Sequence, residues 1–75
     1  MADPELPSPE AWLAAFAEQL GVLAPDAATI ETLLDLAGVA AHASARQAAP
    51  IACWLVGQAG LSPDEALAKA RATRA

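Results

Sequence analysis

The chain is poor in the residue types that build most active sites. Its 75 residues include one Cys, one His, one Phe, two Trp and no Tyr. A single Cys excludes an intramolecular disulfide, and the lack of a CxxC motif or a Cys/His pair argues against a zinc site. No nucleophile, base and orienting residue occur in a recognisable arrangement. We therefore expect a non-enzymatic protein without a metal or cofactor.

Basic residues and long apolar runs are also scarce. Four Lys and Arg stand against nine Asp and Glu, which gives a net charge of -5. Nucleic acids and anionic membranes are bound through basic surfaces, so neither is expected as a partner. No apolar run approaches the length of a membrane span, and the acidic N-terminus does not resemble a signal peptide. These features predict a soluble, cytoplasmic protein.

Helix start and stop signals punctuate the sequence. Residues 1–7, with two Pro and two acids, predict a disordered acidic tail, and residues 8–75 predict a single helical domain. Ser8 is a suitable N-cap for a first helix that begins at Pro9 and ends before Gly21. Trp12 and the other large residues of this helix recur at helical spacing and predict a buried face.

Three further helices follow the same logic. Asp26 can cap a second helix, in which apolar residues recur at helical spacing with no proline before Pro50. Its apolar stripe is broad, which predicts a central helix. Pro50 is interpreted as the first-turn proline of a third helix over 51–59, and Ser62 opens a capping box for a fourth. The predicted fold is an all-α small bundle of four short helices.

The predicted core is thin because more than half of the apolar residues are Ala. The larger side chains that we expect to fill it are Leu6, Trp12, Leu13, Phe16, Leu20, Val22, Leu23, Ile30, Leu33, Leu34, Leu36, Val39, Ile51, Cys53, Trp54, Leu55, Val56, Leu61 and Leu67. A core of this size has little stability to spare. A homodimer is therefore a further hypothesis.

Several residues of types that are rare in this chain lie close together in sequence between the second and third predicted helices. His42 and Arg46 are four residues apart, so on one helix they share a face near its C-terminal end. The helix that starts near Pro50 would bring free N–H groups and a positive dipole end close by. The set predicts a site for a phosphate or for the carboxylate of a partner. The alternative is structural, with both side chains hydrogen-bonding the last carbonyls of the second helix.

The neighbouring Cys53 and Trp54 also have two interpretations each. Cys53 lacks a nearby base, so we interpret it as a small buried hydrophobe and not as a nucleophile. Trp54 either fills a gap in the core or serves as an exposed interface anchor. The candidate residues for binding an anion or a partner are therefore His42, Arg46, Pro50 and Trp54.

The region from the second to the third helix resembles a known family. It is similar to a small helical domain of unknown function in high-GC bacteria, found alone or on the C-terminal side of molybdenum cofactor guanylyltransferases. The matching residues are Trp12, Leu13, Leu34, Leu36, Ala37, Ala41, His42, Arg46, Ala48, Ala49, Pro50, Leu55, Gly57 and Gly60. Gln47 stands where that family usually has a proline. The Gly-rich nucleotide loop of the guanylyltransferase itself is absent.

The resemblance implies an accessory role beside molybdenum cofactor guanylylation. We accordingly expect a module that binds another protein, with a molybdenum cofactor nucleotidyltransferase as the implied partner. The alternative is a small helical domain that binds an anion or nucleotide at the turn between the second and third helices. Nucleotide binding by the isolated chain would distinguish this alternative from protein binding.

Overall fold

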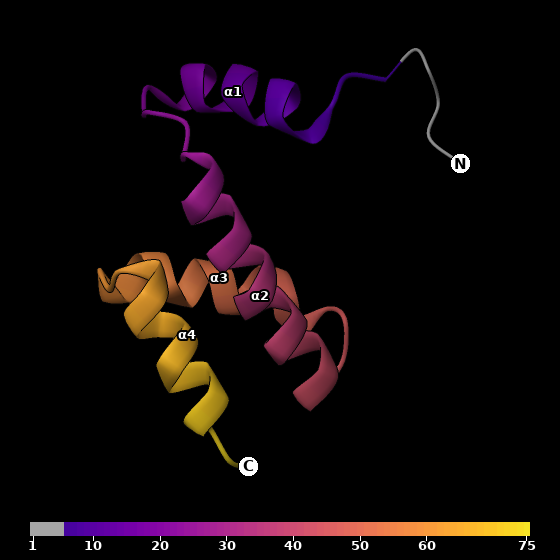
Figure 1. The fold of residues 1–75 in the computed structure, drawn as a ribbon, viewed down its shortest axis with the longest axis vertical. Coiled ribbons are helices and arrows are strands. Elements are labelled where there is room, and N and C mark those ends of the chain that lie inside the picture. Colours follow the sequence, from indigo (N-terminus) through magenta and orange to yellow (C-terminus); the bar gives the residue numbers. More distant parts are fainter. Residues whose placement is uncertain (1–5) are drawn as a thin grey trace.

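Four helices make up the computed structural model, which describes residues 6–75 (Figure 1). They are α1 (Pro9–Leu20), α2 (Ala27–Ala43), α3 (Ala48–Ala59) and α4 (Pro63–Ala72). Within residues 6–75 there is no strand, and no helix is long and apolar enough to span a bilayer. The all-α fold with four short helices is confirmed. Of the predicted tail at residues 1–7, positions 1–5 lie outside the described residues.

Polar caps fix where three of the helices begin. Ser8, Asp26 and Ser62 have extended backbone, and each accepts a hydrogen bond from the N–H three residues on, at 3.1, 2.8 and 3.2 Å. These bonds satisfy donors that the helix itself leaves free. The hydrogen bonds from Thr29 also lower the pKa of Asp26, because they stabilise the ionised carboxylate. The predicted starts of α1, α2 and α4 are confirmed.

Two glycines end α1 and α3 as predicted. Gly21 and Gly60 adopt the left-handed conformation, with φ of 72° and 69°. A residue with a Cβ would be strained there. The N–H of Gly60 donates to the carbonyls of Val56 and Gly57 at 3.1 and 3.3 Å, so the last turn of α3 is closed.

The boundary between α2 and α3 differs from the prediction. Helix α2 ends at Ala43, because Ser44 leaves the helical region with φ -140° and ψ -93°. Helix α3 already begins at Ala48, so Pro50 is its third residue and not its first. A proline is tolerated anywhere in the first turn, since those N–H groups have no helical acceptor. The position of Pro50 therefore predicted the first turn of α3 correctly, but not the residue at which α3 begins.

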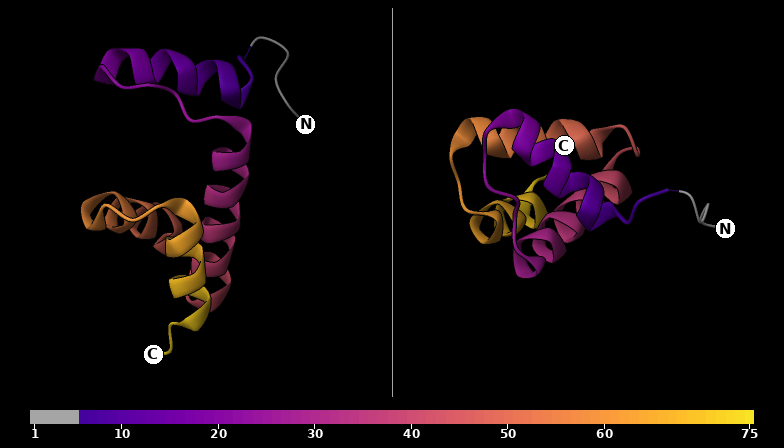
Figure 2. Two further views of the ribbon diagram at one scale, coloured as in Figure 1. Left: turned by 60° about the vertical axis from the view of Figure 1, so that its left-hand side comes forward. Right: turned by 90° about the horizontal axis from the view of Figure 1, so that it is seen from above.

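Helix α2 is the central helix, and α3 and α4 both pack against it. Helix α1 lies across one end of the molecule, beyond the start of α2, while α3 and α4 flank the remainder of α2 (Figures 1 and 2). Leu36 of α2 is the one large side chain among residues 6–75 that is almost completely buried, at 2% exposure. Ala66 of α4 is 4% exposed. The core consists of α2 with the faces of α3 and α4 that cover it.

Most of the predicted core is exposed instead. Trp12, which we expected in the core, is 54% exposed, and Trp54 is 62% exposed. Helical periodicity marks which residues share a face, but it does not reveal whether another element covers that face. The exposed large apolar side chains are Leu6, Trp12, Leu13, Phe16, Leu20, Val22, Leu23, Leu34, Ile51, Trp54 and Leu55.

Candidate partner-binding site

Backbone hydrogen bonds shape the turn over residues 44–47 that joins α2 to α3. The N–H of Ser44 donates to the carbonyl of Ala40 at 3.1 Å and closes α2. The N–H of Ala48 donates to the carbonyl of Ala45 at 2.8 Å and opens α3. The N-cap of α3, Gln47, makes no side-chain capping bond. The turn is therefore held by its main chain.

All four candidate residues lie at the surface around this turn. His42 is in the last turn of α2, Arg46 is in the connecting turn, and Pro50 is in the first turn of α3. Trp54 follows Pro50 by four residues, so the two share a face of α3. The exposure of Trp54 contradicts its interpretation as a core residue, and its role as an interface anchor stays a prediction. For brevity we use the name Trp54 face for these four exposed residues, which lie near one another along the chain.

His42 and Arg46 do not have the relation that their spacing predicted. Arg46 lies beyond the end of α2, so the two side chains do not share a helix face. Across residues 6–75, neither side chain donates a hydrogen bond to a carbonyl. His42 does lie in the last turn of α2, but the hydrogen bond that ends α2 comes from the main-chain N–H of Ser44. The structural interpretation of the two side chains stays a prediction.

The start of α3 offers fewer anion-binding donors than expected. The N–H groups of Ala48 and Ala49 already donate to the carbonyls of Ala45 and Arg46, at 2.8 and 3.2 Å. Pro50 has no N–H to offer. An anion here would rely on the side chains of His42 and Arg46 together with the helix dipole. The anion site stays a prediction.

Cys53 is a free, half-buried thiol on α3. Its place agrees with the interpretation as a small apolar residue. Residues 6–75 contain no group of three His, Cys, Asp or Glu side chains close enough to hold a metal ion. The exposed groups around the turn are an aromatic ring, a proline and two basic side chains.

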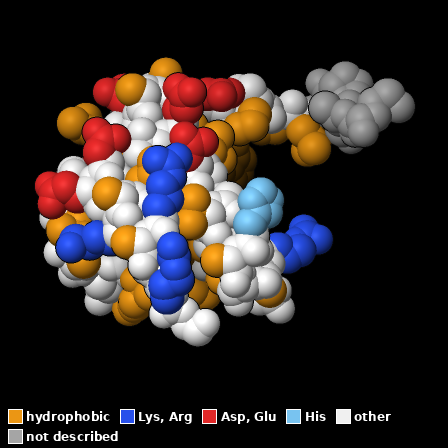
Figure 3. Space-filling view, turned by 60° about the horizontal axis from the view of Figure 1, so that its bottom comes forward, with side chains coloured by type: hydrophobic (Ala, Val, Ile, Leu, Met, Phe, Trp, Pro, Cys, Tyr) orange, Lys and Arg blue, Asp and Glu red, His pale blue; other side chains and the backbone are white. Residues whose placement is uncertain are grey.

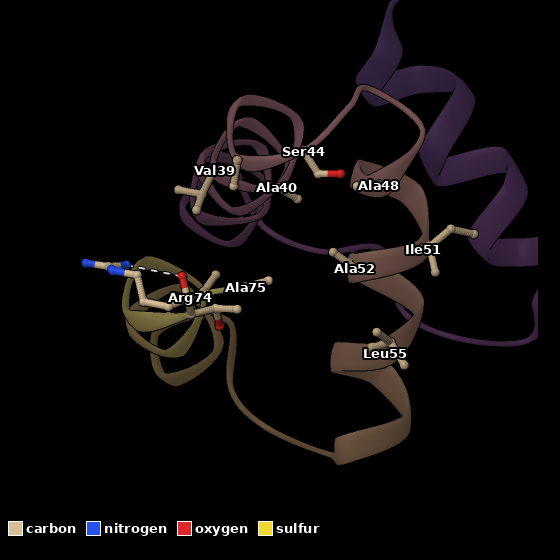
Figure 4. Close-up of a pocket in the computed structure, with 12 residues that line it drawn as sticks. Val39, Ala40, Ser44, Ala48, Ile51, Ala52, Leu55, Arg74 and Ala75 are labelled. Atoms are coloured by element: carbon tan, nitrogen blue, oxygen red, sulfur yellow. Dashed lines mark hydrogen bonds between the residues drawn. The ribbon is translucent and has the colours of Figure 1, made fainter.

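The sequence did not reveal an apolar groove of about 600 Å³ that lies between α3, α4 and the second half of α2 (Figure 4). We call it the α3–α4 groove. Ile51 and Leu55 line one wall and are 61% and 55% exposed. The remaining lining is largely alanine and Val39, and the groove continues towards Leu36 as a smaller hollow of about 250 Å³. The sequence feature that could have predicted this groove is the large number of alanines, because small side chains on three adjoining helices leave space between the helices.

Most of the basic side chains lie towards the end of the chain. Three of the four basic residues, Lys69, Arg71 and Arg74, lie on α4 and the segment after it. Figure 3 shows basic side chains gathered on the face near the C-terminus, with acidic ones on another part of the surface. Arg74 also lines the groove, and its guanidinium donates to the carbonyls of Arg71 and Thr73 at 3.2 and 3.1 Å. The groove is thus apolar with a basic margin.

Comparison with known proteins places the chain in a family. A family model described as a domain of unknown function, DUF6457, matches residues 5–75. No curated protein and no solved structure gives a match. The family match covers nearly the whole chain, including α1, so α1 is part of the family domain. The chain belongs to the DUF6457 family of domains of unknown function.

Proposed function

We propose that this chain is a non-enzymatic module that binds another protein. The observation that carries the proposal is the amount of large apolar side chain left at the surface. Eleven such side chains are exposed among residues 6–75, and they lie before α1, on α1, α2 and α3, and in the α1–α2 connection. Exposed apolar surface of this extent is characteristic of binding surfaces.

The total accessible surface supports the same conclusion. It is 6033 Å², whereas a closed monomer of 7.6 kDa would expose about 4,300 Å². An allowance of about 800 Å² for residues 1–5, which lie outside the described residues, leaves an excess of about 900 Å². The Cα radius of gyration is 13.5 Å, against about 11 Å for an ordinary domain of 75 residues. The extra area is of the size that a protein partner covers.

The Trp54 face is the surface that we assign to a different protein. Trp and Arg dominate the binding energy of protein interfaces, and both occur here, at Trp54 and Arg46. Pro50 adds a rigid apolar contact one turn from Trp54. His42 and Arg46 supply the polar surroundings that an apolar anchor requires.

A molybdenum cofactor guanylyltransferase is the partner that we propose. The support is the sequence resemblance described above, which is carried mainly by α2, the turn and α3. In this proposal the domain is an accessory to cofactor guanylylation and leaves the nucleotide chemistry to its partner. His42, Arg46 and Pro50 belong both to the resemblance and to the Trp54 face.

The test is capture of the purified guanylyltransferase from the same genome by the tagged chain. Trp54→Ala is expected to raise the dissociation constant at least about thirtyfold, the usual effect of losing an interface hot spot. Trp12→Ala, an equally exposed Trp on α1, is the matched control and should retain binding. Capture should not respond to added nucleotide. Equal binding by the parent chain and by Trp54→Ala would contradict the proposal.

The anion-binding alternative has its own test. Phosphate or GTP titrated into the isolated 15N-labelled chain would shift the amide resonances of residues 46–52 in a saturable way if His42 and Arg46 formed such a site. Arg46→Ala should abolish those shifts, while Arg71→Ala on α4 should not. Saturable shifts that vanish in Arg46→Ala would favour this alternative over protein binding.

A further inference from the structure

Helix α1 has a buried residue, Ala17 at 7% exposure, but its large apolar side chains are only partly covered by residues 6–75. Trp12, Phe16 and Leu20 are 54%, 45% and 59% exposed. The rings of Trp12 and Phe16 stack on each other at 5.0 Å, but no other helix packs closely against α1. A helix of 12 residues is marginally stable in water by itself. The capped, amphipathic α1 therefore requires a surface on which to lie.

The α3–α4 groove is a surface of matching chemistry. It is apolar, its volume of about 600 Å³ is open to solvent, and Ile51 and Leu55 stand exposed along it. In Figure 4, Ala52 of α3 points towards Val39 and Ala40 of α2, whereas the side chain of Ile51 projects from the outer side of α3. An amphipathic helix with anchors four residues apart is the ordinary occupant of such a groove.

Charge also matches the two surfaces. The charged residues of α1 are Glu10 and Glu18, and it has no basic residue. Among the residues that line the groove and its extension, the charged ones are Arg74 and Lys69. An acidic helix thus meets a groove whose charged margin is entirely basic.

The structure places α1 far from the groove of its own chain. Helix α1 leads into the start of α2, whereas the groove begins at Val39, twelve residues after Ala27. At 1.5 Å per residue this is about 18 Å along α2. The first half of α2 is acidic, with Asp26, Glu31 and Asp35, and does not attract α1 electrostatically. The distance along α2 keeps α1 from the groove of its own chain, whereas α1 of a second copy is not limited in this way.

The amount of exposed surface suits a dimer. The excess over a closed monomer is about 900 Å² or more, and a standard interface buries about 800 Å² from each partner. In a two-fold symmetric pair, each copy would donate its α1 and receive the other, so the apolar face of α1 and the groove would both be covered in each copy.

We propose that the chain forms a homodimer in which α1 of each copy lies in the α3–α4 groove of the other, with Trp12 and Phe16 against Ile51 and Leu55. Trp54 does not line the groove, although Ile51 and Leu55 are its neighbours on α3. The proposal does not require the guanylyltransferase as a partner, and the variants Trp54→Ala and Phe16→Glu test the two proposals separately.

The test uses the full chain in sedimentation velocity over a range of concentrations. We expect a monomer–dimer equilibrium whose dissociation constant rises at least about thirtyfold in Phe16→Glu and in Leu55→Glu. Trp54→Ala should dimerise like the parent chain. Circular dichroism shows whether each variant retains its helices. A monomer at every concentration, or a dimer insensitive to both Glu substitutions, would overturn the proposal.

Mixing the two damaged chains identifies the docking mode. Phe16→Glu retains an intact groove and Leu55→Glu retains an intact α1, so an equimolar mixture should form a heterodimer held by one docked helix, although neither variant dimerises alone. In Trp54→Phe, Trp12 is the only Trp, and its fluorescence should move to shorter wavelength as concentration rises. A blue-shifted Trp12 that does not respond to dilution would show that α1 folds onto its own chain and would overturn the proposal.

Discussion

Leucines on the same helix differ sharply in how deeply they are buried, and so in how much they contribute to stability. Leu34 and Leu36 are both on α2 and both belong to its apolar pattern, yet Leu36 is 2% exposed and Leu34 is 67% exposed. The difference is that α3 and α4 cover only part of α2. Whether a leucine contributes to the core therefore depends on whether neighbouring helices bury it, and not on the residue type.

Leu36→Ala is expected to lower the free energy of unfolding by about 2–4 kcal/mol, from the lost burial and the cavity left behind. Leu34→Ala should change it by less than about 0.5 kcal/mol, because the side chain is already in water. Urea unfolding of both variants at one protein concentration measures the contrast. Equal losses in the two variants would show that α2 is covered differently.

At the scale of the element, the two ends of α3 differ. Its N-cap, Gln47, makes no side-chain capping bond, whereas Gly60 ends the helix in the left-handed conformation. Gly60 ends the helix with φ 69°, whereas Gly57 is inside the helix with ordinary dihedral angles. A Cβ added at either glycine would meet no atom within 4 Å. The two positions therefore differ in backbone conformation and not in available space.

Gly60→Ala is expected to destabilise the domain by about 1–2 kcal/mol, since Ala is strained in the left-handed region. Gly57→Ala should stabilise it by about 0.5–1 kcal/mol, because Ala loses less entropy in a helix. Thermal unfolding followed at 222 nm should shift the midpoint in opposite directions. A loss in both variants would indicate that Gly57 has a packing role.

The whole molecule has a larger accessible surface than a compact monomer of the same mass. Its principal extents are 40 × 30 × 19 Å, and α1 lies at one end of the longest direction in Figure 1. Exchange of α1 between two copies would cover its apolar face and the groove together. Stability would then depend on the protein concentration, because association stabilises the folded state by mass action.

The thermal midpoint of the parent chain is therefore expected to rise by about 5–10 °C when concentration increases a hundredfold, from the coupling of folding to dimerisation. Phe16→Glu, with α1 unable to dock, should show a midpoint independent of concentration. Differential scanning calorimetry at several concentrations measures both. A constant midpoint in the parent chain would contradict coupled association.

Local interactions made much of this protein predictable from its sequence. The caps at Ser8, Asp26 and Ser62 and the stops at Gly21 and Gly60 act within four residues, so they are readable in the sequence. Four helices, their approximate bounds and the absence of strands in the described residues followed from these signals. Pro50 was located in the correct turn for the same reason.

Burial was decided by the tertiary structure. Trp12 and Leu36 both belong to regular apolar stripes, but only α2 has neighbours that cover its stripe. Arg46 missed its predicted helix because the backbone at Ser44 left the helical region two residues earlier. The groove arises where three consecutive helices pack together, with lining residues from Val39 to Ala75, and the surroundings of a side chain depend on such packing. The periodicity of the sequence determines which residues share one side of a helix, whereas only the tertiary structure determines whether another helix or solvent lies against that side.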